Sequence, residues 1–241
     1  MSASGALHGR VAVVVGATGW MGRAICREFV ESGASLVMVA RDEQRLDDLE
    51  RELAAGDRVL AVAADVTSQL AIDDVRVAAI ARFGHIDLVA VLSGVITGSA
   101  FDDGIPADWA QMIDVNLRGL LHASQTFADP LLQSARRGLP ADLFLLGSVS
   151  KETHTPRFAV FNAISSAIKQ LSQTLRYEYG PQGLRVHLLQ PGFPQPAEDP
   201  RGGRSDSPLQ PEAIAAVVGL AAALPRSANL AELLIIPTVT E

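Results

Sequence analysis

The sequence contains little that would place this protein outside a cell or in a membrane. Its 241 residues include one cysteine, Cys26, which has no partner for an internal disulfide and therefore fits a reducing compartment. The first nine residues form no apolar signal region, and no run approaches the ~18 apolar residues of a membrane span. We expect a cytoplasmic protein that does not enter a membrane, with Cys26 as a small core residue rather than a nucleophile.

The chain also lacks an excess of positive charge. Its formal net charge is −7 and its pI is near 5.2. Because binding to nucleic-acid phosphates requires clustered Lys and Arg, this balance argues against nucleic acid as a partner. No set of metal ligands stands out, so no metal is expected, and the partner class that we expect is a small molecule.

Neither a Pro- or Ser-rich linker nor a repeat of fixed period divides the sequence. With 48% hydrophobic residues, the chain is long enough to bury one substantial core. We therefore expect a single domain over residues 1–241. One segment, 194–211, differs from the rest, since it holds five prolines and two adjacent glycines and is typical of a flexible loop.

Continuous apolar runs alternate with segments of helical length. Runs without polar alternation are typical of strands buried on both faces of a parallel sheet. The alternation predicts an α/β fold of the Rossmann type, a doubly wound sheet of about seven mostly parallel strands with helices on both faces. The predicted strands are Val11–Val15, Ser35–Ala40, Val59–Ala63, Ile86–Leu92, Leu143–Leu146, Val186–Leu189 and Leu233–Ile236. The predicted helices include Met21–Ser32, Asp42–Ala55, Trp109–Leu132 and Phe158–Tyr179.

A glycine-rich segment lies between the first predicted strand and the first helix. It reads Gly16-Ala17-Thr18-Gly19-Trp20-Met21-Gly22. Glycine permits a tight turn and lets backbone N–H groups approach a pyrophosphate, whose charge is favoured at a helix N-terminus. Because it follows a strand and opens a helix, the segment predicts a dinucleotide site at residues 16–22. In such sheets ligands bind beyond the carboxyl ends of the strands, and we expect the 194–211 loop to cover the substrate there.

The end of the second predicted strand indicates which dinucleotide is bound. An acidic residue here would bind a ribose 2′-OH, but the sequence has Ala40 followed by Arg41. A small residue and a guanidinium fork leave room for a 2′-phosphate and can bind it. This favours NADP(H) over NAD(H). The alternative, a solvated Arg41 at the start of the next helix, stays open.

A later strand and helix carry the clearest family resemblance. The strand Leu143–Leu146 leads to Ser148, and thirteen residues later a helix includes Phe161 and Ser165. Together with the glycine segment they resemble the short-chain dehydrogenase/reductase family, and the resemblance extends over essentially the whole chain. In that family hydride passes between a nicotinamide and a carbonyl carbon, while Ser, Tyr and Lys at these positions polarise the carbonyl, donate the proton and lower the Tyr pKa.

The resemblance implies further site residues. It assigns adenine contacts to Asp65 and Val66, although Asp65 can equally be a helix cap. It assigns Ser93 and Gly94 to the cofactor, Asn116 to a proton relay, and Pro191 and Gly192 to a turn beside the nicotinamide. It also implies a homodimer or homotetramer packed through the long helices.

Several positions depart from the family pattern. Phe161 replaces the Tyr and cannot donate a proton, and Ser165 replaces the Lys and carries no charge. Trp20 occupies a position where most family members of this length have Gly. Val91 and Leu92 replace an Asn-Asn pair. These departures leave Ser148 and Asn116 as the retained catalytic candidates.

The proton source is therefore the open question. Among nearby residues, His154 has the most suitable pKa for an acid, and Lys151 and Arg157 could polarise an oxygen; each can equally be part of a solvated loop. We expect an oxidoreductase that acts on a carbonyl or hydroxyl compound. An apolar pocket at Phe161 and Ser165 would favour an aromatic substrate. The alternatives are a non-catalytic cofactor- or metabolite-binding protein, and a non-redox lyase or isomerase.

Overall fold

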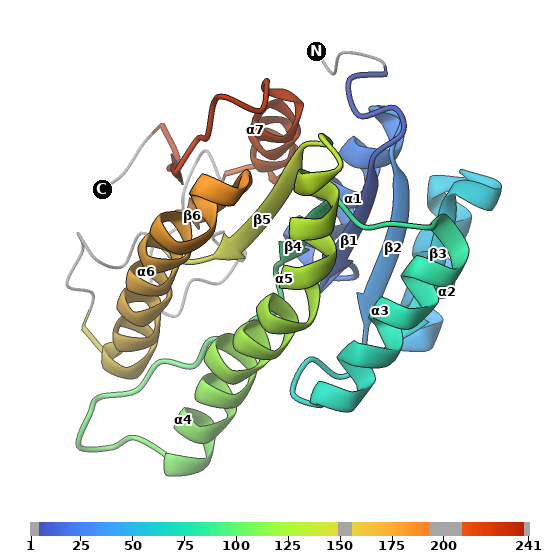
Figure 1. Cartoon of the computed structure of the whole chain (residues 1–241). Coiled ribbons are helices and arrows are strands. Elements are labelled where there is room, and N and C mark those ends of the chain that lie inside the picture. The colour runs from blue at the N-terminus through green and yellow to red at the C-terminus, as the bar shows by residue number, and fades with distance from the viewer. Residues whose placement is uncertain (1–4, 149–155, 193–208, 239–241) are drawn as a thin grey trace.

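The computed structural model describes residues 5–148, 156–192 and 209–238. Within these ranges the chain alternates strands and helices from β1 to β7 (Figure 1). The strands are β1 (Val11–Val15), β2 (Ser35–Ala40), β3 (Val59–Ala63), β4 (Leu88–Val91), β5 (Ala141–Leu146), β6 (Leu184–Pro191) and β7 (Glu232–Ile235). The α-helices are α1 (Trp20–Glu31), α2 (Glu43–Leu53), α3 (Gln69–Phe83), α4 (Pro106–Met112), α5 (Leu120–Arg136), α6 (Ala159–Tyr179) and α7 (Pro211–Ala223). Three short helical segments complete the order: η1 (Gly56–Arg58), η2 (Ile113–Gly119) and η4 (Gly180–Gln182).

The strands form one seven-stranded sheet in the order β3-β2-β1-β4-β5-β6-β7. Every pairing is parallel; Val13, for example, lies opposite Val37 of β2 and Val89 of β4. The predicted doubly wound sheet is therefore confirmed. The chain changes direction across the sheet between β1 and β4, which is the place where such folds bind ligands.

All seven predicted strands are present, but the bounds of some of them differ from the prediction. β1, β2 and β3 have the predicted bounds. β4 is shorter than the predicted 86–92, while β6 is longer than the predicted 186–189. β6 extends because it pairs on both sides, with β5 and with β7, so polar positions outside its apolar run still form ladder hydrogen bonds.

Two apolar cores cover the two faces of the sheet. Alternate residues of β1 point to opposite faces: Ala12 and Val14 pack with α1 and α7, and Val13 and Val15 pack with α3 and α5. In Figure 1, α3, α5 and α6 lie on the same side of the sheet. Cys26 of α1 is fully buried in the first core, and burial raises the pKa of its thiol far above the ordinary value. This thiol is a core group, as predicted.

One long helical stretch runs from Pro106 to Arg136 and changes its winding in the middle. The predicted helix 109–132 is confirmed and extends further at both ends. Its central segment, η2, is a π-helix between α4 and α5. Such wide turns are rare and are frequent at functional sites.

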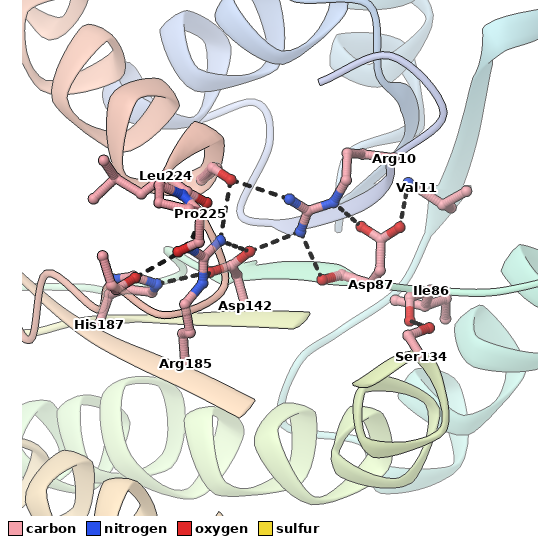
Figure 2. A network of polar contacts seen from close by, with 12 residues as sticks. Arg10, Val11, Ile86, Asp87, Ser134, Asp142, Arg185, His187, Leu224 and Pro225 are labelled. Atoms are coloured by element: carbon pink, nitrogen blue, oxygen red, sulfur yellow. Dashed lines mark hydrogen bonds and ion pairs between the residues drawn. The ribbon is translucent and has the colours of Figure 1, made fainter. Parts of the chain in front are cut away.

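The amino ends of the strands hold a buried network of charges that the sequence reading did not identify (Figure 2). Arg10 precedes β1, Asp87 precedes β4, and Asp142 and Arg185 lie near the starts of β5 and β6. None of these four residues is more than 6% exposed. Asp142 accepts hydrogen bonds from Arg10 Nη2 at 2.7 Å, Arg185 Nη2 at 2.8 Å and His187 Nε2 at 2.8 Å.

The same network ties the last helix to the sheet. Arg10 donates to the carbonyl of Ala222 at 3.1 Å, and Arg185 donates to the carbonyl of Leu224 at 2.8 Å. Burial alone would raise the pKa of Asp142, but hydrogen bonds from His187 and Arg185 and the charge of Arg10 outweigh it and lower that pKa. Asp142 is therefore a buried carboxylate held in its ionised form by two guanidinium groups and a hydrogen bond with His187.

Candidate active site

The opposite edge of the sheet, at the carboxyl ends of the strands, gathers the predicted site residues. The glycine segment follows β1, Arg41 follows β2, Asp65 follows β3, Ser93 follows β4 and Ser148 follows β5. Pro191 ends β6 and Gly192 comes next. Because all the strands are parallel, these positions lie along one edge. The topology thus brings together residues that are up to 176 positions apart, from 16 to 192.

The glycine segment forms a turn that has no room for a side chain at Gly16 or Gly22. Gly16 has φ +92°, and a Cβ there would lie 2.7 Å from the backbone nitrogen of Ser93. A Cβ on Gly22 would lie 2.1 Å from the carbonyl oxygen of Gly16. Both approaches are to backbone, which cannot move aside as a side chain can. Gly16 and Gly22 are therefore required by the close contact of β1, β4 and α1.

The first turn of α1 has backbone N–H groups that no side chain caps. Its N-cap is Gly19, and the first turn contains no acidic residue. The helix dipole and the N–H groups there favour an anion. Trp20, the first residue of α1, is 42% exposed and Met21 is half-buried. The Trp20 side chain therefore lies on the outside of the turn rather than in the core.

A contact missed by the sequence analysis supports this turn from α2. Arg45 Nη2 donates to the carbonyl of Thr18 at 2.9 Å, while the Arg45 backbone N–H donates to the Asp42 carboxylate at 3.1 Å. Arg45 thereby joins the start of α2 to the glycine turn. The only sign in the sequence was the position of Arg45 in the first turn of the helix after the second strand. That position does not specify which group the side chain contacts.

Arg41 and Asp65 come close together across the ends of β2 and β3. The Asp65 Oδ1 atom accepts from the Thr67 backbone N–H at 2.9 Å and from the Thr67 hydroxyl at 2.8 Å. The Thr67 backbone bond is the main cause that lowers the pKa of Asp65, followed by its hydroxyl and the charge of Arg41. Arg41 itself is exposed. An ionised carboxylate therefore lies near the proposed phosphate-binding guanidinium.

The suggestion that Asp65 caps a helix is wrong. The N-cap of α3 is Ser68, whose hydroxyl accepts from the Ala71 N–H at 3.3 Å. Asp65 instead closes a turn onto Thr67, two residues away. The neighbouring Val66 is 5% exposed, and a Cβ on Gly119 would lie 2.7 Å from its Cγ1 atom. Val66 thus packs against the π-helical segment η2.

Ser93 contributes a hydroxyl without a partner at the centre of this edge. Its Oγ is buried and forms no hydrogen bond within the described residues. Such groups are uncommon in folded proteins, because an unmade bond costs free energy. An unpaired hydroxyl beside the glycine turn is expected where a bound polar ligand completes the hydrogen bonding. The adjacent Gly94 leaves a Cβ position 3.5 Å from the Oδ1 atom of Asn116.

Asn116 is fixed by the chain that follows β4. Its Oδ1 accepts from the backbone N–H of Val95, and its Nδ2 donates to the carbonyl of Val95, both at 2.7 Å. These two bonds join η2 to the segment that follows β4. Its position within a π-helix could not be read from the sequence, because no periodicity distinguishes one wide turn.

Ser148 lies at the end of β5 and is 7% exposed. Its carbonyl accepts from Gln190 Nε2 at 3.2 Å, which fixes it against the end of β6. Gly192 donates its N–H to the carbonyl of Ile235 at 2.6 Å, and a Cβ there would lie 3.0 Å from Pro237 Cδ. The Pro191 and Gly192 turn is therefore closed by β7.

The helix expected to carry Tyr and Lys carries neither function. Phe161 lies in the first turn of α6, half-buried against the core on that face. The Ser165 hydroxyl donates to the carbonyl of Phe161 at 2.9 Å. Lys169, one turn further on, pairs with Glu232 of β7 at 2.8 Å. Lys169 is therefore engaged elsewhere and does not replace the missing Lys.

Two predicted features lie outside the described residues. These are the candidate acid His154 with its neighbour Lys151, and residues 194–208 of the expected substrate loop. The loop was drawn too long, because its last residue, Pro211, is the first residue of α7. Within the described residues, no cluster of three or more His, Cys, Asp or Glu could hold a metal ion. No helix there is long and apolar enough to cross a membrane.

Comparison with known proteins identifies relatives of the sequence. The short chain dehydrogenase family matches residues 10–198. An uncharacterized oxidoreductase of Staphylococcus epidermidis is 38% identical over 184 residues, which are 76% of this chain and 77% of that protein. An uncharacterized oxidoreductase of Staphylococcus aureus is 29% identical over 232 residues, covering 96% and 98%.

Solved structures share the fold over nearly the full length. A metagenomic short-chain oxidoreductase in complex with NADP aligns with a TM-score of 0.83 at 28% identity, covering 98% of this chain and 100% of that one. An alcohol dehydrogenase from the archaeon Thermococcus sibiricus, complexed with 5-hydroxy-NADP, aligns with a TM-score of 0.85 at 25% identity, covering 95% and 97%.

Proposed function

The chain belongs to the short-chain dehydrogenase family, and on that basis we propose that it is an NADP(H)-dependent oxidoreductase with an unusual proton source. Its substrate would be a small carbonyl or hydroxyl compound. The proposal assigns cofactor binding to the carboxyl edge of the sheet, where the residues from Gly16 to Gly192 meet. Two relatives of known structure were solved with NADP or a derivative of it.

The observation that carries this proposal is the shape of the glycine turn. A Cβ on Gly16 or Gly22 would meet backbone at 2.7 Å or 2.1 Å, and the uncapped N–H groups of α1 lie beside them. The buried hydroxyl of Ser93 adds a polar group that has no hydrogen-bond partner among the described residues. These features fit a dinucleotide whose pyrophosphate accepts from the first turn of α1. When bound, the cofactor supplies or accepts a hydride.

Arg41 is the residue that we assign to the 2′-phosphate. It is exposed directly after β2, whose last residue is Ala40 and not an acidic residue that would bind a ribose 2′-OH. A guanidinium can bind a phosphate through two parallel hydrogen bonds. The Asp65 carboxylate lies near enough to offset part of the attraction of Arg41 for a phosphate, so the preference for NADP(H) should be marked without being absolute.

The residues at the reacting end divide the catalytic work differently from the family pattern. Ser148 can hold a substrate oxygen by a hydrogen bond, and Asn116 fixes the backbone of Val95 after β4. Phe161 offers an apolar ring and no proton. A positioned acid is typically worth about 10²- to 10⁴-fold in rate. We propose that the proton comes from His154, from water or from the substrate's own hydroxyl, and that orientation supplies the remaining acceleration.

Transfer of label tests this function. The protein would be incubated with NADPH deuterated at one face of C4 and a panel of ketones, and the products analysed by mass spectrometry. We expect deuterium from one face only to appear at the carbinol carbon. The reaction is run with each of the two labelled forms, one deuterated at each face of C4. Products without deuterium from both forms, while NADPH is consumed, would exclude direct hydride transfer.

A specific observation favours a second candidate, a non-catalytic NADP(H)-binding protein. Ser165 is bonded to its own helix and Lys169 pairs with Glu232, so no described residue of this face supplies the missing cation. Under this reading NADPH would bind without turnover of any ketone. Binding and label transfer measured on the same preparation distinguish the two candidates.

We also propose that the protein is a homodimer or homotetramer. The stretch from α4 to α5 exposes Ile113 at 39% and Leu121 at 43%. Association of two such helices would cover these side chains. Sedimentation velocity tests the proposal, and a monomer at all concentrations would contradict it.

A further inference from the structure

The first turn of α2 sends one side chain back to the glycine turn. Arg45 Nη2 donates to the carbonyl of Thr18 at 2.9 Å. Thr18 is 8% exposed and directly precedes Gly19, the N-cap of α1. A side chain of α2 therefore holds the peptide that leads into α1.

That peptide is fixed at both of its polar groups. The Thr18 carbonyl and the Gly19 N–H belong to one planar unit, so the direction of one sets the direction of the other. Arg45 binds the carbonyl, and the Gly19 N–H donates to the carbonyl of Gly16 at 3.1 Å. Glycine would otherwise let this peptide rotate with little hindrance. The N–H groups in the first turn of α1 follow directly, so this arrangement also sets their direction.

The base of the Arg45 side chain is fixed as well. Its backbone N–H donates to Asp42 Oδ1 at 3.1 Å, and Asp42 is the N-cap of α2. The next residue, Leu46, is 1% exposed and lies in the same core as Ala17 of the glycine turn. The bond from Arg45 to Thr18 thus joins two elements that already share one packed core.

The bond to Thr18 sets Arg45 apart from neighbouring arginines of α1 and α2. Arg23 pairs with Glu52, and Arg51 pairs with Asp48. In the part of the chain that the structure describes, Arg45 has no carboxylate partner. Its guanidinium therefore serves the glycine turn and not the ion pairs of the surface.

We propose that Arg45 is a positioning residue for the pyrophosphate of the dinucleotide. It holds the Thr18–Gly19 peptide in the orientation that aims the first turn of α1 at the pyrophosphate, and it does not contact the cofactor itself. Arg41, directly before the Asp42 cap, binds the 2′-phosphate instead. The inference rests on the proposed function, and it divides the work of two arginines at the start of α2.

The test measures binding of three probes to the full chain. NADPH and NADH share the pyrophosphate and differ in the 2′-phosphate, whereas adenosine 2′-monophosphate has the 2′-phosphate and no pyrophosphate. Fluorescence titration follows the dinucleotides, and NMR titration follows the more weakly binding monophosphate. In Arg45→Gln we expect NADPH and NADH to lose affinity by the same factor, roughly fivefold, because binding must then order the turn. Affinity for the monophosphate should not change.

Three further variants separate positioning from charge and from folding. Arg41→Gln should give the opposite pattern, with NADPH and the monophosphate weakened and NADH unchanged. Arg45→Lys should lose a smaller and again equal factor for both dinucleotides, because an ammonium can donate to the carbonyl but lacks the planar fork. It carries the test should Arg45→Gln not fold. Arg51→Gln removes the same charge from α2 at a side chain that is 69% exposed, and it should bind all three probes as the wild type does.

The outcomes distinguish this inference from the function on which it rests. If the wild type binds neither dinucleotide, the proposed function fails and the inference fails with it. If the wild type binds NADPH and Arg45→Gln binds both dinucleotides equally well, the inference alone is overturned. A loss confined to NADPH would also overturn it, because Arg45 would then contact the 2′-phosphate. A loss for all three probes, with lower stability in urea, would assign Arg45 to the fold of α2 and overturn it too.

Discussion

The two ends of the sheet differ in whether their buried polar groups have partners within the protein. At the amino end, Arg10, Asp87, Asp142 and Arg185 are buried, and each charge has a partner. At the carboxyl end, Gly16 and Gly22 leave no room for a side chain of their own, and the hydroxyl of Ser93 has no partner among the described residues. One end is complete by itself, and the other has the groups that a ligand would complete. We infer that changes at the amino end affect stability, and that changes at the carboxyl end affect binding.

The largest effect is expected from Asp142→Asn at the amino end. This change removes the anion that Arg10, Arg185 and His187 share. Removing one partner of a buried ion pair typically costs about 3–5 kcal/mol, because the remaining charges stay buried. Urea denaturation followed by circular dichroism would measure the loss.

The matched control is Asp48→Asn, on the surface of α2. Asp48 also pairs with an Arg, but both side chains are exposed, and such pairs contribute less than about 1 kcal/mol. Equal losses in the two variants would show that burial of the network does not matter. NADPH affinity of the folded Asp142→Asn protein should equal that of the wild type.

A double change restores the missing acid at the carboxyl end. Phe161→Tyr with Ser165→Lys places a phenol and an ammonium where the family has them. We expect ketone reduction to rise by roughly 10²-fold, the lower value for a positioned acid. Steady-state rates with NADPH and a panel of simple ketones would measure it. An unchanged rate would mean that this face of α6 is not where the proton is delivered.

Gly22→Ala tests whether the glycine turn forms the cofactor site. The added Cβ would lie 2.1 Å from the Gly16 carbonyl, so α1 must move away from the turn. Overpacking of this kind costs about 1–3 kcal/mol, and we expect NADPH affinity to fall roughly tenfold or more. Gly180→Ala is the control, since a Cβ there meets nothing within 4 Å. Equal affinity in the two variants would exclude the turn.

Arg41→Gln should affect one cofactor and spare the other. Loss of the guanidinium should weaken NADPH binding about tenfold, which corresponds to about 1.4 kcal/mol of binding free energy. NADH binding should not change, because it has no 2′-phosphate. Fluorescence titrations with both cofactors would measure this, with Arg51→Gln as control. A parallel loss for NADPH and NADH would assign Arg41 a structural role.

The smallest expected effect is on the stability of the protein at acidic pH. The pKa of Asp142 in the folded protein lies below its ordinary value of 3.8. Its contribution to stability is therefore complete above that value and is lost as pH falls through the folded pKa. The wild type should lose stability below about pH 4 more steeply than Asp142→Asn. Parallel pH dependence in the two proteins would contradict this assignment.

Local patterns in the sequence predicted the fold well. Buried strands such as β1 are continuous apolar runs, and the Gly16 to Gly22 segment has one structural solution between a strand and a helix. The amino-end network was missed, because its members are single charges at the starts of four strands. Only the sheet order places Arg10 beside Asp87 and Asp142. A charge directly before or within an otherwise apolar strand was the signal available.

For the catalytic part of the site, the sequence showed only which family residues are present and which are replaced. Sequence matching identified Phe161 and Ser165 as departures. The sequence does not show that Ser165 donates to Phe161, that Lys169 pairs with Glu232, or that Asn116 lies in a π-helix. These depend on side-chain directions and on the packing of α6 against β7.

The central claim is that the carboxyl edge of the sheet holds NADP(H), and titration of NADPH fluorescence tests it most directly. The account predicts saturable binding at submillimolar NADPH, weaker binding of NADH, and loss of affinity in Gly22→Ala. Absence of NADPH binding at submillimolar concentration in the wild type would contradict it.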